Sequence, residues 1–239
     1  MIRGLIFDFD GLIIDTEMPD FASWQEMFAE HGAELPREMW SPLIGHAIAS
    51  FDIYDYLEQQ AGRPIDRDDV RARRRARYLQ MIEAQAILPG VEEWIREAKA
   101  RGMKVGLASA SNTEWVVGHL ERLGLHVHFD TVKTRDDVPV GKPDPAVYRA
   151  ALDALGLTAA EAVAFEDSMN GIAAAKAAGL FCVTIPNAMT HDLDLSAADL
   201  RLESLAHLSL DELLAEVERR KGPERIEPPR TPRTPRERD

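Results

Sequence analysis

Two aspartates near the start of the chain have the spacing of a catalytic pair. Asp8 and Asp10 follow an apolar run that ends at Phe7, and they precede Gly11, which lets the chain turn away. Residues i and i+2 of an extended strand point to the same side, so the two carboxylates would lie together. Buried carboxylates that repel each other need a cation. An Asp-x-Asp alone remains a weak signal, because a solvated loop gives the same pattern.

Three later segments place polar residues in the same kind of position. Each lies between an apolar run and an expected helix, or directly before a helix; they are Ser109-Ala110-Ser111, Lys142 and Glu166-Asp167. Small hydroxyl side chains and backbone N–H groups at such a position suit a phosphate oxygen. The serines could instead cap the following helix, and the two acids could begin one. The joint occurrence of all four positions favours a functional site.

The chemistry that this set of residues suits is phosphoryl transfer. A carboxylate can attack phosphorus to form an aspartyl phosphate, which divides one difficult step into two. The attack brings two anions together, so a metal cation and an ammonium group must offset their repulsion. Oxygen ligands without a histidine cluster or a thiolate indicate Mg²⁺ rather than zinc. A second carboxylate must protonate the leaving oxygen and later activate water.

The elements that must position these residues alternate between strands and helices. We expect strands at 2–9, 103–108, 129–134, 162–165, 181–185 and 200–202, and helices at 91–101, 113–123, 145–155, 171–178 and 210–219. This alternation predicts an α/β fold with a doubly wound, Rossmann-like parallel sheet. Ligands of such sheets bind at the carboxyl ends of the strands, where the four polar segments are expected.

Residues 16–81 interrupt this alternation and have the pattern of helices. Phe21, Trp24 and Phe28 share one helical face, and we expect them to pack rather than to hold substrate. The prediction is a catalytic core built from residues 1–15 and 82–221, with an inserted all-helical cap domain at 16–81. Residues 222–239 alternate proline with charge and are predicted to be disordered.

The composition narrows the range of partners. The chain has 239 residues, of which 45% are hydrophobic and 29% charged, as in an ordinary globular protein. A formal net charge of -13 argues against nucleic acid or an anionic membrane as a general partner, but not against a small phosphorylated metabolite. The single cysteine, Cys182, lies in an apolar run and should be an unreactive buried thiol. We recognise no signal peptide or membrane-spanning run, and we expect a cytoplasmic monomer.

In these four polar segments, the chain resembles phosphatases of the haloacid dehalogenase (HAD) superfamily, in the branch that includes β-phosphoglucomutase. The resemblance covers about residues 1–219. It rests on four motifs in order, namely Asp8-Phe9-Asp10-Gly11, Ser109, Lys142 and Glu166-Asp167. As a set, these motifs are highly specific.

The resemblance implies a role for each core residue. Asp8 would be the nucleophile and Asp10 the general acid/base. Ser109 and the backbone N–H of Ala110 would grip the phosphoryl oxygens, with Ser111 as a further candidate at this place. Lys142 would neutralise the charge between the phosphate and Asp8.

The resemblance also implies a metal site and a moving cap. Mg²⁺ would be held by Asp8, the backbone carbonyl of Asp10, and Asp167, with Glu166 as a ligand or as a neighbour of the ligands. The helical insertion would close over the site, exclude bulk water and select the substrate. His46 and Arg74 are the cap residues that we expect to touch the substrate.

The cap also favours one activity over another. Asp20, Ile48 and Arg74 stand where β-phosphoglucomutase is expected to carry a histidine, an arginine and a lysine. These three departures favour hydrolysis of a small sugar or polyol phosphate over a phosphomutase, which stays as the alternative. A non-catalytic sugar-phosphate-binding protein is less favoured. Dehalogenase activity is disfavoured, because those relatives usually lack an acid at Asp10 and an acidic pair at 166–167.

Overall fold

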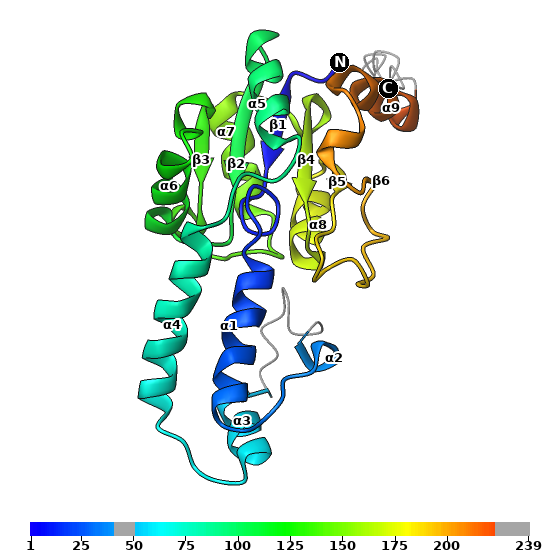
Figure 1. Ribbon diagram of the computed structural model, residues 1–239. Coiled ribbons are helices and arrows are strands. Elements are labelled where there is room, and N and C mark those ends of the chain that lie inside the picture. Colours follow the sequence, from blue (N-terminus) through cyan, green and yellow to red (C-terminus); the bar gives the residue numbers. More distant parts are fainter. Residues whose placement is uncertain (41–50, 223–239) are drawn as a thin grey trace, which may run out of the picture.

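Six parallel strands form one sheet in the computed structural model, which describes residues 1–40 and 51–222 (Figure 1). The strands are β1 (Gly4–Phe7), β2 (Lys104–Ala108), β3 (Thr131–Lys133), β4 (Ala162–Glu166), β5 (Phe181–Thr184) and β6 (Leu200–Arg201). Their order across the sheet is β3-β2-β1-β4-β5-β6. The order reverses direction between β1 and β4, which is where ligands of such sheets bind.

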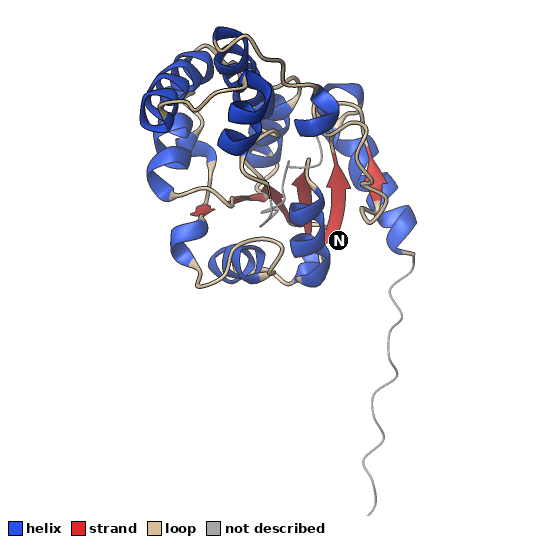
Figure 2. Ribbon diagram, turned by 90° about the horizontal axis from the view of Figure 1, so that it is seen from below, coloured by secondary structure: helices blue, strands red, loops and turns tan. Residues whose placement is uncertain are grey.

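Helices cover both faces of this sheet, as Figure 2 shows with the strands between them. Leu5 and Phe7 of β1 face one apolar cluster, and Ile6 faces the other, because successive side chains of a strand alternate. The first cluster includes α5 (Val91–Ala100), α6 (Thr113–Arg122) and α9 (Leu210–Lys221). The second includes α7 (Ala146–Leu155) and α8 (Met169–Ala177). The predicted doubly wound α/β fold is confirmed.

In the described part of the chain, four helices lie beyond the carboxyl ends of the strands (Figure 1). They are α1 (Glu17–Glu30), α2 (Arg37–Trp40), α3 (Ile53–Ala61) and α4 (Arg67–Glu83). Phe21, Trp24 and Phe28 are buried in a third apolar cluster between these helices, so their expected packing role is confirmed. The helical insertion of the predicted fold is therefore present, and we call these four helices the cap.

The main difference from the predicted elements lies at β1. The apolar run predicts a strand at 2–9, but β1 ends at Phe7. The backbone N–H of Asp8 still donates to the carbonyl of Phe165, whereas the carbonyl of Phe9 already accepts hydrogen bonds from a tight turn at Leu12 and Ile13. The apolar character of Phe9 thus reflects burial rather than strand pairing.

Two kinds of prediction are not tested by the structure: those for residues that it does not describe, and those for the boundaries between core and cap. His46, Ile48 and residues 223–239 lie outside the described residues. The limits of core and cap at 15/16 and 81/82 stay predictions; α1 begins at Glu17, and α4 continues to Glu83. Among the described residues, no helix is both long and apolar enough to cross a membrane.

Cys182 gives a simple test of the packing of β5. The residue is fully buried, and this burial raises the pKa of its thiol, so little reactive thiolate forms. We expect a disulfide reagent such as 5,5′-dithiobis(2-nitrobenzoate) to modify no thiol in the native protein at pH 8 and one thiol per chain in guanidinium chloride. Rapid modification of the native protein would contradict the burial of β5.

Candidate active site

Asp8 lies directly after β1, beside the end of the neighbouring strand β4. Phe7 and Phe165 are register partners and their rings stack at 4.8 Å, so Asp8 and Glu166 follow at the same edge of the sheet. Both carboxylates are buried, and Glu166 is fully so. The pairing of β1 with β4 therefore brings together two acids that are far apart in the sequence.

Lys142 joins these two carboxylates. Its Nζ lies 2.6 Å from Asp8 Oδ1 and 2.6 Å from Glu166 Oε1, and its side chain is only 4% exposed. The hydroxyl of Tyr148 in α7 also donates to Glu166 Oε1, at 2.6 Å. Burial lowers the pKa of Lys142, but the two carboxylates outweigh it and raise this pKa overall. The ammonium group is therefore held in its charged form.

Asp8, Glu166 and Asp167 form a compact acidic group. Each contributes a carboxylate oxygen, and these oxygens lie within 4.8 Å of one another. Burial raises the pKa of Asp8 to about 8, and burial together with Asp8 and Glu166 raises the pKa of Asp167 well above its usual value. Three buried carboxylates around one ammonium group fit a hard divalent cation, which would offset the remaining negative charge.

Asn187 orients Asp167 and was not found from the sequence. Its Nδ2 donates to Asp167 Oδ2 at 2.7 Å and to the carbonyl of Gly11 at 3.3 Å. Gly11 has a φ of 75°, and a Cβ there would lie 2.2 Å from Asp167 Oδ2. Asn187 follows the carboxyl end of β5, so the rule that located the other site residues could have located this one as well.

Asp10 is held by donors from the segment that follows β2. Its Oδ2 accepts from the hydroxyls of Ser111 at 2.7 Å and Ser109 at 3.3 Å. Its Oδ1 accepts from the indole N–H of Trp115 at 2.9 Å. Asp8 and Asp10 thus have different partners: Asp8 bonds to a lysine, and Asp10 to three neutral donors.

The alternative that the serines cap the next helix is wrong. Asn112 is the N-cap of α6, and its side chain accepts from the backbone N–H of Trp115 at 2.9 Å. The hydroxyl of Ser109 instead accepts from the backbone N–H of Ser111 at 3.0 Å. Likewise Ser168, not Glu166 or Asp167, caps α8, through the backbone N–H of Gly171. Ser109, Ser111, Glu166 and Asp167 therefore do not serve as helix N-caps, and their side chains can contribute to the site.

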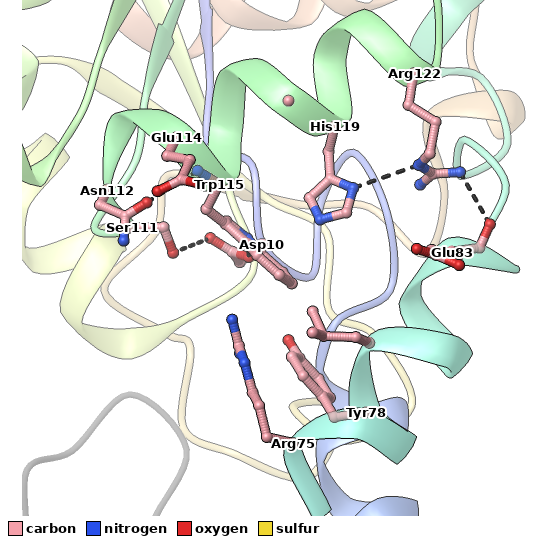
Figure 3. Close-up of a pocket in the computed structure, with 12 residues that line it drawn as sticks. Asp10, Arg75, Tyr78, Glu83, Ser111, Asn112, Glu114, Trp115, His119 and Arg122 are labelled. Carbon is pink, nitrogen blue, oxygen red and sulfur yellow. Dashed lines mark hydrogen bonds between the residues drawn. The ribbon is translucent and has the colours of Figure 1, made fainter. Parts of the chain in front are cut away.

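The core residues border a cavity of about 340 Å³ between the core and the cap. Its lining comprises Asp8, Asp10, Thr16, Glu17, Asp20, Tyr78, Ala110, Ser111, Lys142, Asp167, Ser168 and Asn170. A second cavity of about 650 Å³ adjoins it and shares Asp10, Tyr78 and Ser111 (Figure 3). Asp10 therefore stands between the acidic group and a larger space that could receive the rest of a substrate.

Comparisons with known proteins agree with this arrangement. The model of the haloacid dehalogenase-like hydrolases matches residues 2–179. The chain belongs to this family.

Individual relatives extend the likeness over most of the chain. The YhcW protein of Bacillus subtilis is 46% identical over 90% of this chain and 97% of its own. Hexitol phosphatase B of Escherichia coli is 33% identical over 89% of this chain and 97% of its own. A crystal structure of a CbbY variant from Rhodobacter sphaeroides, in complex with xylulose-(1,5)-bisphosphate, has a TM-score of 0.67 and 30% identity over 87% of this chain and 97% of that one.

The cap of this hydrolase places at the larger cavity an arginine that the sequence did not single out. Arg74 forms an ion pair with Asp20, and its Nε donates to the hydroxyl of Ser23 at 3.1 Å. Arg75, not Arg74, is among the described residues that line the larger cavity, and in Figure 3 it extends toward Asp10. Adjacent residues of a helix point about 100° apart, and no local feature of an arginine run shows which one faces the core.

Glu17 is a further acid that lines the smaller cavity, and it was not predicted from the sequence as a site residue. Burial, followed by the charges of Asp10, Asp15 and Asp8, raises its pKa from the usual 4.5 to about 7. It begins α1, directly after the segment that leads from the core into the cap. Glu17 therefore changes its charge near neutral pH in the metal-free protein.

The raised pKa of Glu17 predicts a pH-dependent effect of Glu17→Gln on stability. Because the folded state binds the proton more tightly than the unfolded chain, this carboxyl costs stability progressively as the pH rises from about 4.5 to about 7. In EDTA, the variant should melt at the same temperature as the wild type at pH 4.5 and a few degrees higher at pH 8. Exposed Glu34→Gln is the control and should show no such trend; a pH-independent difference for Glu17→Gln would contradict the assignment.

Gly171 of α8 packs directly against the carboxylate of Glu166, and this close packing can be tested by substitution. A Cβ at Gly171 would lie 1.8 Å from Glu166 Oε2, so Gly171→Ala must displace a carboxylate that Lys142 and Tyr148 hold. We expect a loss of about 3 kcal/mol in the free energy of unfolding, measured in urea, because a buried ion pair is disturbed. Gly118→Ala in α6 meets nothing within 4 Å and should be neutral or slightly stabilising. Equal stabilities of the two variants would count against the packing of Gly171 on Glu166.

Proposed function

We propose that this hydrolase is a Mg²⁺-dependent phosphatase that acts on a small sugar or polyol phosphate monoester through a phospho-Asp8 intermediate. The observation that carries the proposal is the convergence of Asp8, Lys142, Asp167 and Asp10 on one cavity. A nucleophile, a fixed positive charge, a further carboxylate for a metal and an acid/base are the parts that phosphoryl transfer requires. Each comes from the carboxyl end of the sheet or the loop directly beside it.

The hydrogen bonds of the acidic group support one choice of metal ligands. Glu166 already accepts from Lys142 and Tyr148 at Oε1 and from Ser168 at Oε2. Asp8 and Asp167 are therefore the carboxylates better placed to hold Mg²⁺, with the backbone carbonyl of Asp10 as the third expected ligand and Glu166 as their neighbour. When bound, the cation would offset the charge of the phosphoryl group and of Asp8.

The first half of the reaction transfers the phosphoryl group to the protein. An oxygen of Asp8 forms a bond to phosphorus while the bond from phosphorus to the substrate oxygen breaks. Lys142, 2.6 Å from Asp8 Oδ1, stabilises the negative charge that gathers there. Ser109 and the N–H of Ala110 hold the phosphoryl oxygens, with Ser111 beside them. Protonated Asp10 gives its proton to the leaving oxygen and so releases the alcohol.

The second half returns the protein to its starting state. The carboxylate of Asp10 takes a proton from water as the water oxygen attacks phosphorus of phospho-Asp8. The bond from phosphorus to Asp8 breaks, and inorganic phosphate leaves. Asp10 is then protonated for the next cycle, so protons and charges balance over the two steps.

The substrate class is supported by the relatives and by the size of the site. One relative is named a hexitol phosphatase, and the CbbY variant was crystallised with a phosphorylated ketose. Two adjoining cavities of about 340 and 650 Å³ provide room for a phosphoryl group and a leaving group of sugar size. We therefore propose a sugar or polyol phosphate rather than a nucleotide or a phosphoprotein. His46 and Arg74 stay candidate substrate contacts.

The proposal predicts that Asp8→Asn abolishes turnover, because an amide cannot replace the attacking carboxylate. The measurement is ³¹P NMR of the protein with Mg²⁺ and a panel of sugar and polyol phosphates, including β-glucose 1-phosphate and sorbitol 6-phosphate. The wild type should release inorganic phosphate, and EDTA should stop it. The exposed Asp153→Asn serves as the matched control and should keep full activity.

Other outcomes of the same experiment would contradict the proposal. Turnover by Asp8→Asn would exclude Asp8 as the nucleophile, and full activity in EDTA would exclude the metal. Conversion of a 1-phosphate into a 6-phosphate without free phosphate would instead identify a phosphomutase. Binding of sugar phosphates without any conversion would identify a non-catalytic binding protein.

A further inference from the structure

Trp115 connects the acid/base to the cap. Residue 115 lies in the first turn of α6, where its backbone N–H is fixed by the cap residue Asn112. Its indole Nε1, which can only donate, gives its hydrogen bond to Asp10 Oδ1 at 2.9 Å. A side chain with a short, rigid attachment to α6 thus determines the direction of one oxygen of Asp10.

The indole ring is itself held from the cap side. Tyr78 of α4 stacks on Trp115 with ring centroids 5.8 Å apart and an angle of 10° between the planes. Cζ of Arg75, from the same helix, lies 5.6 Å from the centre of the indole. On the core side, His119 of α6 packs edge-on at 4.3 Å. Figure 3 shows Trp115 and Asp10 facing Arg75 and Tyr78 across the cavity.

The other donors to Asp10 are not equivalent to Trp115. Ser109 and Ser111 donate to Oδ2, and both belong to the segment proposed to hold the phosphoryl group. A bound phosphoryl group would compete for these hydroxyls. Trp115 bonds to the opposite oxygen, Oδ1, and lies outside that segment, so its hydrogen bond can persist while the substrate is bound. It would then leave Oδ2 free to exchange a proton.

We propose that Trp115 is a positioning residue, which aims the carboxylate of Asp10 at the leaving oxygen and then at water, and that Tyr78 of the cap holds Trp115 in place. The inference rests on the proposed phosphatase function. It has a structural consequence: when α4 docks on α6, the stacking of Tyr78 on Trp115 would complete the orientation of the acid/base. Closing of the cap and readiness for proton transfer would then be one event.

The test uses Trp115→Phe, which keeps an aromatic ring for the stack but removes the N–H donor. Steady-state kinetics are measured on the fastest sugar or polyol phosphate of the panel above and on p-nitrophenyl phosphate. We expect kcat for the sugar phosphate to fall about tenfold or more, because the hydrogen bond to the carboxyl group of Asp10 is lost. KM should change less than threefold, because phenylalanine keeps an aromatic ring at this wall of the larger cavity.

A second readout separates positioning from general damage to the fold. p-Nitrophenolate leaves without needing a proton, so the first step on p-nitrophenyl phosphate should survive in Trp115→Phe. Hydrolysis of phospho-Asp8 still needs Asp10 as a base and should slow. The variant should therefore release one equivalent of p-nitrophenolate per chain in a burst, followed by slow turnover. Simple structural damage would slow both phases and give no burst.

The chain offers a matched control in Trp94→Phe. Trp94 also donates its indole N–H, to the carbonyl of Leu208 at 3.2 Å, and it packs on Phe165 at 5.6 Å, but it does not contact Asp10. The Trp94→Phe variant loses the same indole N–H group, but it should keep the wild-type kcat and show no burst of p-nitrophenolate. Tyr78→Leu, which removes the stacking ring and keeps Trp115, should reproduce the kinetic signature of Trp115→Phe and serves if that variant does not fold.

The outcomes distinguish this inference from the proposed function. A wild type that hydrolyses sugar phosphates, with Trp115→Phe and Tyr78→Leu at full or raised kcat, would overturn the positioning role alone. A rise in KM without a fall in kcat would overturn it as well and make Trp115 a substrate contact. A wild type that hydrolyses neither class of substrate would overturn the proposed function and this inference with it.

Discussion

The ammonium group of Lys142 is the point on which the site depends. It lies between two buried carboxylates, 2.6 Å from each, at the edge where β1 and β4 end. Without it these two buried carboxylates would have no positively charged partner among the described residues of the core, and an unpaired buried charge costs several kcal/mol. The fully buried Tyr148 beneath them adds a second donor to Glu166. The same contacts thus hold the end of the sheet together and prepare Asp8 for its proposed role.

The core and the cap contribute different kinds of side chain to the site, and the fold explains this difference. The core provides carboxylates, serines and a lysine on loops that rigid strands fix in place. The cap provides aromatic and charged side chains from the start of α1 and from the middle and C-terminal part of α4. Asp10 is where the two sets meet. It hydrogen-bonds to Ser111 on the core, and through Trp115 it is connected to Tyr78 of the cap. A substrate that fills the space between them would contact both.

The alternation of strands and helices along the chain, and the polar segments expected at the carboxyl ends of the strands, could be predicted because both depend on local patterns. An apolar run followed by an acid or a serine marks the end of a buried strand whether or not its neighbours are known, and parallel strands bring such ends together. The same rule applied to β5 would have found Asn187, which follows Ile185 and Pro186. The N-caps of α6 and α8 were not identified from the sequence: they are Asn112 and Ser168, although other polar residues lie within three positions of each.

The sequence by itself determined the class of chemistry, the alternation of strands and helices, and the inserted helical segment, because residue type and periodicity encode these locally. Only the tertiary structure decided which arginine of α4 lines the cavity, that Asp20 pairs with Arg74, and that Trp115 donates to Asp10. Those contacts join residues some 50 to 100 positions apart, or depend on the rotation of one helix against another. The packing of whole side-chain surfaces sets that rotation, and no short stretch of sequence contains it.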